Sequence, residues 1–301
     1  MHFADRLFKH IQQKSPIMLG IDPDFDLIPD VLLPQSSDAH HVSKSLFDFS
    51  KIVIDCTAPY ICGVKFQSAY FEQQGSAGIN ALAKAIAYAK SLQIPVVLDG
   101  KRGDIGSSST AYATAFLKGH TQLRNNQTLY SDFESDALTV APYMGDDSLR
   151  PFVEAATQHN KGLFVLVKTS NAGSATLQDL DTPTGPLFYQ TAKLVHGYTQ
   201  NNPLGLCGFS HIGAVVGATH PDILLSLRQQ MPKALFLMPG VGAQGSSIDS
   251  LKKSLHGDLT GIIIPISRGI THVNDLSCSL ETYQDSVKQN LELFYNRIEL
   301  V

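Results

Sequence analysis

The sequence predicts an α/β fold in which a single (β/α)8 barrel, with extra helices and loop insertions, takes up residues 1–301. Short apolar runs rich in β-branched residues recur eight times, and stretches with helical periodicity separate several of them. The runs are too continuously apolar to leave one face in water, which is typical of parallel strands covered by helices. The chain is also long enough to bury the core of such a barrel.

The expected strands are defined by these apolar runs, at 16–22, 61–66, 94–99, 137–142, 162–168, 212–218, 234–240 and 261–267. Clear helical patterns lie between strands at 79–92, 148–158, 187–200 and 221–231. Pro, Asp and Gly close many of the strands, as expected where a strand passes into a loop. The polar stretches 119–135 and 170–186 exceed ordinary connections, so we interpret them as surface insertions and as a candidate cover for the active site.

Composition and charge restrict the class of partner. The formal net charge is -4 and no run of Lys or Arg stands out, which argues against nucleic-acid or membrane-surface binding and favours a small molecule. The four cysteines lack CxxC spacing, no His or Cys group has the spacing of a metal site, and the N-terminal stretch does not resemble a signal peptide. We therefore expect a cytoplasmic protein without a bound metal.

Charged side chains stand at the ends of the first three expected strands. Asp22 ends the first, Lys65 lies at the end of the second, and Asp99 and Lys101 end the third. In a barrel these ends meet at one mouth, and Asp99 and Lys101, two positions apart on an extended backbone, share a face. Solvated salt bridges on the rim are the alternative. A cluster drawn from three strands favours a functional site.

The last two expected strands indicate a phosphate site. A glycine-rich loop containing Gly242 and Gln244 follows the seventh strand, and Arg268 follows the eighth. Barrels commonly hold phosphate at this place, and the arginine guanidinium can donate two parallel hydrogen bonds to the oxygens of one phosphate group.

The same glycine-rich loop also fits a dinucleotide-binding fingerprint. Gly240, Gly242 and Gly245 form GxGxxG after a strand, and Asp258 follows at a plausible distance. That fingerprint belongs in the first βαβ unit of a nucleotide domain, whereas most of the alternating pattern here precedes it. A nicotinamide-dependent oxidoreductase is therefore the weaker interpretation.

The segments GIDPD, GVKFQSAYFE, LDGKRGDIGSS, MPGVGAQG and SRG together resemble orotidine 5'-phosphate decarboxylases, in particular the longer bacterial form with the KRGDIG signature. The resemblance spans the first to the eighth expected strand. It implies a cofactor-free carboxy-lyase of pyrimidine biosynthesis that converts orotidine 5'-monophosphate to uridine 5'-monophosphate. It also implies a (β/α)8 homodimer with shared active sites.

The resemblance also assigns roles to individual positions. It makes Lys65, Asp99, Lys101 and Asp104 an alternating charge array, with Lys101 the proton donor and Asp104 entering the neighbouring subunit's site. The remaining matches are to substrate-binding residues: Asp22 for the ribose, Ser170 for the pyrimidine, Gln244 and Arg268 for the phosphate, and Ser108 across the dimer interface.

Two positions depart from the usual pattern of that family. Ser108 replaces a threonine, which keeps the hydroxyl and loses a methyl group, and Gly100 replaces an alanine between Asp99 and Lys101. Neither change removes a functional group. Two other activities remain open: a metal-dependent sugar-phosphate decarboxylase or synthase, which shares the DxKxxD core, and a nucleotide-binding barrel without catalysis.

Overall fold

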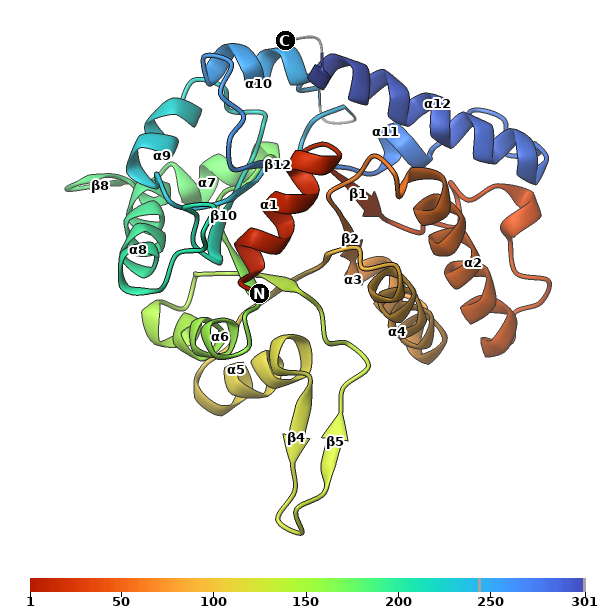
Figure 1. The fold of residues 1–301 in the computed structure, drawn as a ribbon, viewed down its shortest axis with the longest axis horizontal. Coiled ribbons are helices and arrows are strands. Elements are labelled where there is room, and N and C mark those ends of the chain that lie inside the picture. Colours follow the sequence, from red (N-terminus) through yellow and green to blue (C-terminus); the bar gives the residue numbers. More distant parts are fainter. Residues whose placement is uncertain (243–244, 300–301) are drawn as a thin grey trace.

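The computed structural model, which describes residues 1–242 and 245–299, contains a closed barrel of eight parallel strands (Figure 1). Each strand overlaps one of the eight expected segments, so the predicted (β/α)8 fold is confirmed. Around the barrel the strands follow the order β1, β2, β3, β6, β7, β10, β11 and β12, which is their order along the chain. Their bounds are β1 Ile17–Ile21, β2 Gly63–Gln67, β3 Val96–Arg102, β6 Ala137–Val140, β7 Gly162–Lys168, β10 Ile212–Val216, β11 Phe236–Leu237 and β12 Ile262–Ile266.

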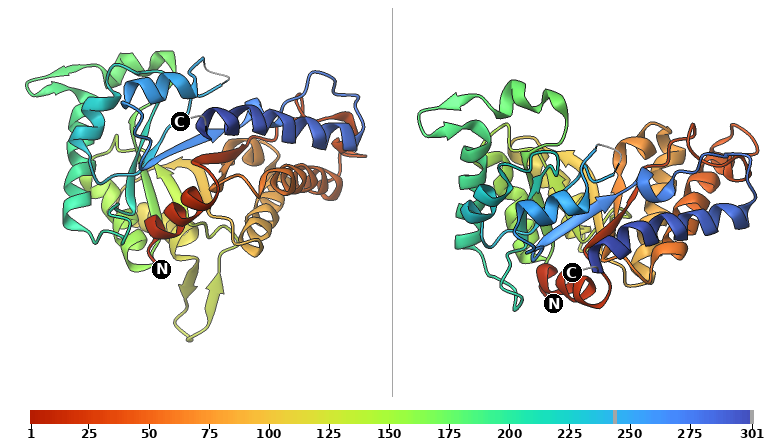
Figure 2. Two further views of the ribbon diagram at one scale, coloured as in Figure 1. Left: turned by 45° about the horizontal axis from the view of Figure 1, so that its top comes forward. Right: turned by 90° about the horizontal axis from the view of Figure 1, so that it is seen from above.

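Helices surround the barrel, and α4, α6, α8 and α9 coincide with the four helical patterns read from the sequence (Figures 1 and 2). Among the described residues, no helix is both long and apolar enough to cross a membrane. The helix bounds are α1 Phe3–Gln13, α2 Ala39–Thr57, α3 Ser68–Glu72, α4 Gly75–Ser91, α5 Gly106–Ala113, α6 Asp146–Gln158, α7 Ala175–Gln178, α8 Leu187–Asn201, α9 Leu224–Gln230, α10 Ile248–Ser254, α11 Arg268–Thr271 and α12 Leu280–Glu299.

The strand alternation sorts the side chains into two layers. In β3, Val96 and Leu98 belong to the large apolar core that packs against the helices, whereas Val97 belongs to a second core inside the barrel. The next inward position of β3 is Asp99, and the inward positions of the neighbouring β2 carry Lys65 and Gln67. The interior is therefore apolar at the amino ends of the strands and charged toward their carboxyl ends.

Helix α1 closes the amino end of the barrel. Phe3 and Leu7 pack into the inner core, and the ring of Phe3 meets the ring of Phe164 edge to face with 6.1 Å between centroids. Figure 2 shows α1 and the 170–186 segment at opposite ends of the barrel. The barrel interior is consequently open toward the carboxyl ends of the strands.

The two polar insertions form different structures. The first contains a hairpin of β4 (His120–Gln122) and β5 (Thr128–Tyr130), which stands out from the body of the molecule (Figure 1). The second, 170–186, folds into a short 3-10 turn, α7 and a small hairpin of β8 (Asp181–Thr182) and β9 (Gly185–Pro186). Only the second insertion contributes to the cavity described below.

Candidate active site

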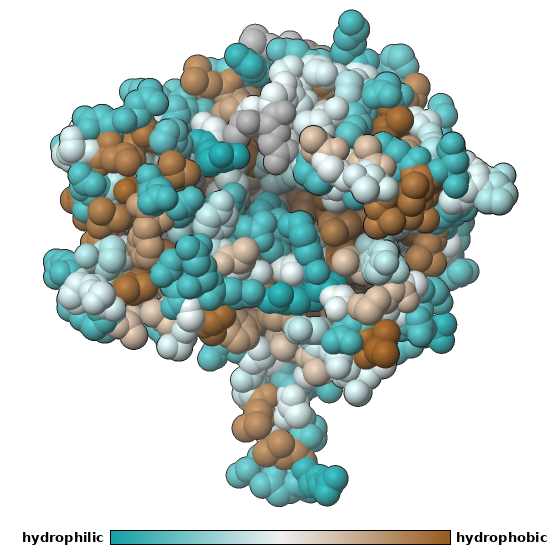
Figure 3. Space-filling view, turned by 180° about the vertical axis from the view of Figure 1, so that it is seen from behind, coloured by the Kyte–Doolittle hydropathy of each residue, from teal (hydrophilic) through white to brown (hydrophobic). Residues whose placement is uncertain are grey.

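A cavity of about 550 Å³ lies at the carboxyl end of the barrel. Figure 3 looks onto this end and shows hydrophilic side chains gathered around the middle of the face. The polar side chains that line the cavity come from the ends of β1, β2, β3, β7 and β12 and from the loops that follow them: Asp22, Lys65, Gln67, Asp99, Lys101, Thr169, Ser170, Asn171, Ser174, Gln178, Ser267 and Arg268.

The carboxylate of Asp99 is the centre of this cluster. Its Oδ2 accepts hydrogen bonds from Lys65 Nζ at 2.9 Å and from Gln67 Nε2 at 3.1 Å. Its Oδ1 accepts hydrogen bonds from Lys101 Nζ at 2.7 Å and from the Thr139 hydroxyl at 2.8 Å. Both oxygens of one buried carboxylate are thus bonded to an ammonium group and to a neutral donor.

Strand register explains why these groups meet. Gln67 of β2 lies opposite Asp99 of β3, and Lys65 lies opposite Val97, so the two β2 side chains face the same interior as Asp99. The β3–β6 pairing is irregular between Leu98 and Arg102, at the point where the chain leaves the regular ladder.

Lys101 reaches Asp99 through an unusual backbone conformation. Its φ is +44°, a left-handed value that is rare for residues other than glycine, and its amide donates to Thr139 Oγ1 at 2.9 Å. The prediction that the backbone is extended through Lys101 is therefore wrong. The prediction that the side chains of Asp99 and Lys101 meet is correct. Thr139 stabilises both parts of the arrangement, the carboxylate and the bent backbone.

The surroundings keep both members of the buried pair charged. Burial alone would raise the pKa of Asp99, but the ammonium groups of Lys65 and Lys101 outweigh it and hold that pKa well below its usual range. Burial alone would lower the pKa of Lys65, but Asp99 and Asp22 raise it above its ordinary value. Asp99 is therefore an anion and Lys65 a cation at neutral pH.

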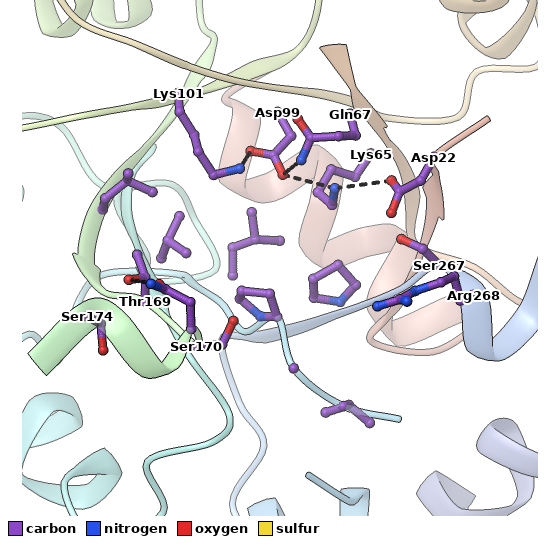
Figure 4. Close-up of a pocket in the computed structure, with 18 of the residues that line it drawn as sticks. Asp22, Lys65, Gln67, Asp99, Lys101, Thr169, Ser170, Ser174, Ser267 and Arg268 are labelled. Carbon is purple, nitrogen blue, oxygen red and sulfur yellow. Dashed lines mark hydrogen bonds and ion pairs between the residues drawn. The ribbon is translucent and has the colours of Figure 1, made fainter. Parts of the chain in front are cut away.

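The two lysines differ in their access to the cavity. The side chain of Lys65 is only 7% exposed and that of Asp99 is 10% exposed, whereas the side chain of Lys101 is 45% exposed. Asp22 Oδ1 lies 4.0 Å from Lys65 Nζ, so Lys101, Asp99, Lys65 and Asp22 form a row of alternating charge (Figure 4). Lys101 is the ammonium group in this row that a ligand can approach.

Arg268, the first residue of α11, stands away from the Asp99 cluster (Figure 4). Ser267 precedes it, and a Cβ on Gly20 of β1 would lie 1.9 Å from the Ser267 hydroxyl, so this close approach requires glycine. Gly242 has a φ of +85° and lines a smaller hollow together with Arg268. Gln244, expected beside it, lies outside the described residues.

Three expected site residues do not line the cavity of their own chain: Gly242, which lines the smaller hollow, Asp104 and Ser108. Asp104 accepts a hydrogen bond from the Ile105 amide at 2.7 Å, and Ser108 is exposed on α5. Neither belongs to the cavity wall. Of the expected residues, the structure brings together Asp22, Lys65, Asp99, Lys101, Ser170 and Arg268.

Gln67 and Thr139 contact Asp99 but were missed by the sequence analysis. Thr139 is a polar residue in the apolar run ALTV, and Gln67 follows Lys65 at the two-residue spacing of a strand. These were usable signals for two further inward-facing polar groups. The pairing of both with Asp99 depends on strand register, which the sequence alone does not give.

Breaking the buried pair should reveal strong energetic coupling. Asp99→Asn would leave the Lys65 ammonium without its nearest anion and should lower the free energy of unfolding by about 3 kcal/mol. In a double-mutant cycle with Lys65→Met, we expect a coupling energy of about 2 kcal/mol, measured by urea unfolding.

The exposed pair Lys51 and Asp55 on α2, with 2.6 Å between Nζ and Oδ2, is the control for this cycle. Its coupling energy should stay below about 0.5 kcal/mol, because solvent screens it. Additive effects of Asp99→Asn and Lys65→Met, within about 0.5 kcal/mol, would contradict the buried interaction.

Comparison with known proteins places this chain in a family. Residues 37–283 match the model of the orotidine 5'-phosphate decarboxylase / HUMPS family. The orotidine 5'-phosphate decarboxylases of Caldicellulosiruptor bescii and Rhodopirellula baltica are 39% and 37% identical, over 90% and 96% of both chains respectively. The structure of Leishmania donovani OMP decarboxylase matches with a TM-score of 0.72 and 30% identity over 100% of both chains. The chain therefore belongs to the orotidine 5'-phosphate decarboxylase / HUMPS family.

Proposed function

We propose that this protein decarboxylates orotidine 5'-monophosphate to uridine 5'-monophosphate and CO2, without a cofactor, by electrostatic stabilisation and protonation of carbon C6. Its family and the names of its relatives support the reaction. The single structural observation that supports the mechanism is the anion of Asp99 held between two ammonium groups, one of which faces the cavity.

The lining of the cavity suggests how the nucleotide would lie in it. Arg268 would bind the phosphate, together with backbone amides of the glycine-rich loop. Asp22 would bind the ribose, and Ser170 would hydrogen-bond the pyrimidine from the opposite wall. Lys101 and Asp99 would then lie beside the reacting carbon.

The proposed step transfers a single proton. The bond between C6 and the carboxylate carbon breaks, CO2 leaves, and the electron pair stays on C6. The Lys101 ammonium stabilises this developing charge and donates its proton to C6. The resulting neutral amine regains a proton from water, while Lys65 remains bonded to Asp99.

Repulsion between Asp99 and the substrate carboxylate would be a smaller contribution. Two unit charges about 4 Å apart repel by about 4 kcal/mol at an effective dielectric constant near 20. Complete relief of that repulsion gives roughly a thousandfold in rate. The two ammonium groups bonded to Asp99 reduce the repulsion further, so stabilisation of the carbanion carries most of the proposed effect.

An absorbance assay tests the reaction. The purified protein should consume orotidine 5'-monophosphate in the presence of EDTA, and Lys101→Ala should lose at least about a hundredfold in kcat because the proton donor is gone. Lys193→Ala, which alters an exposed lysine on α8, should retain activity. Absence of turnover in the unmodified protein would contradict the proposal and favour a nucleotide-binding barrel without catalysis. Turnover that EDTA abolishes would also contradict it and favour a metal-dependent relative.

We also propose that the active site is completed in a homodimer. Asp104 and Ser108 lie outside their own cavity, and the adjacent Ile105, with Tyr143 and Met144 of the β6–α6 loop, exposes apolar surface. The Met144 methyl carbon lies 3.7 Å from where a Cβ on Gly103 would be, so these loops are neighbours. Exposed apolar side chains of this kind favour a protein interface.

Mixing inactive subunits tests the shared site. Asp104→Ala and Lys101→Ala proteins should each be inactive alone. After mixing and subunit exchange they should recover up to about one quarter of normal activity per site, because random pairing makes half of the dimers mixed and each mixed dimer rebuilds one of two sites. The proposal would be contradicted if mass analysis shows that mixed dimers form and the activity of the mixture still does not exceed the summed activities of the two separate variants.

A further inference from the structure

Lys168, the last residue of β7, has a buried ammonium group outside the Asp99 cluster. Its side chain is 2% exposed and does not line the cavity. Its Nζ donates to Asp179 Oδ1 at 2.6 Å and to the Ser174 hydroxyl at 3.2 Å, and lies 5.6 Å from the ring centroid of Phe188. A buried lysine requires such partners, because an unpaired ammonium group is costly to remove from water.

The ion pair of Lys168 and Asp179 joins the two ends of a loop that forms one wall of the cavity. Asp179 follows Lys168 by eleven residues, and the residues between them form one wall of the cavity. A second contact joins the same ends: the Thr169 amide donates to Gln178 Oε1 at 2.9 Å, and Gln178 Nε2 donates to the Thr169 hydroxyl at 2.8 Å. The 170–177 segment is thus fastened at its base.

The neighbouring strand end fixes the backbone of this wall from the other side. The Thr219 hydroxyl donates to the Ser170 carbonyl at 3.2 Å, and His220 Nε2 lies 2.9 Å from the Thr169 carbonyl. A Cβ on Gly217 would come within 2.8 Å of the Ser170 backbone, so Gly217 permits the close approach. The position of Ser170 therefore depends on contacts from both β7 and β10.

We propose that Lys168 and Asp179 are positioning residues for the part of the cavity that binds the pyrimidine ring. This inference rests on the proposed function. The wall that they fasten carries neutral hydrogen-bonding side chains, Ser170 and Asn171, which suit the carbonyl and N–H groups of an uncharged ring. The cationic Arg268 lies across the cavity from this wall (Figure 4). The pair therefore controls recognition of the ring and leaves phosphate binding unaffected.

Two ligands distinguish binding of the pyrimidine ring from binding of the phosphate. Uridine 5'-monophosphate carries ring, ribose and phosphate, whereas ribose 5-phosphate lacks the ring. Lys168→Met keeps the length of the side chain and removes its charge, and should weaken uridine 5'-monophosphate about tenfold, which corresponds to one well-placed hydrogen bond. Its affinity for ribose 5-phosphate should change less than about twofold. Titration calorimetry measures both affinities without turnover.

Lys161→Met is the matched control. Lys161 precedes β7 at the opposite end of the strand, is also buried, and donates to Glu134 Oε1 at 2.5 Å. This variant should lose stability without changing the ratio of the two affinities. Lys168→Arg, which keeps the charge, should restore most of the uridine 5'-monophosphate affinity.

The results distinguish this inference from the proposed function. If the unmodified protein binds uridine 5'-monophosphate no better than ribose 5-phosphate, both proposals are overturned. If it prefers uridine 5'-monophosphate and Lys168→Met keeps that preference, only the positioning role is overturned. Should Lys168→Met not fold, Asp179→Asn, which alters the partly exposed partner, must show the same ring-dependent loss.

Discussion

The arrangement of Asp99 between the ammonium groups of Lys65 and Lys101 is the interaction on which the site depends. A buried carboxylate is stable as an anion only if nearby charges and donors compensate its lost hydration, and here four groups do so. The two lysines differ in exposure, because Lys65 is buried and Lys101 is partly exposed. In the proposed mechanism Lys65 would keep Asp99 charged while Lys101 gives up and regains a proton.

The barrel provides this arrangement through the two-residue alternation of its strands. Inward-facing positions are apolar near α1, where Phe3 seals the amino end, and become charged toward the carboxyl ends at Lys65 and Asp99. The charged groups therefore have the packed core beneath them and the cavity above. The wall between Lys168 and Asp179 follows a related principle, because the buried Lys168 ammonium bonds to the partly exposed Asp179 and joins the ends of a segment whose neutral side chains line the cavity.

The sequence predicted the parts of this structure that depend on local pattern. Apolar runs located all eight strands, and charged residues at strand ends located Asp22, Lys65 and Asp99. Features that depend on register and backbone conformation could not be read in this way, which is why Thr139 was missed and the left-handed conformation of Lys101 was not expected. The role proposed for Asp104 in a shared active site depends on a second subunit.

A crystal structure of the complex with uridine 5'-monophosphate is the most direct test of the central claim. Lys101 Nζ should lie within about 3.5 Å of carbon C6 while still bonded to Asp99, as a positioned proton donor must. Arg268 should contact the phosphate in the same complex. A complex in which another group occupies the position beside C6, or in which Lys101 has left Asp99 for solvent, would contradict the account.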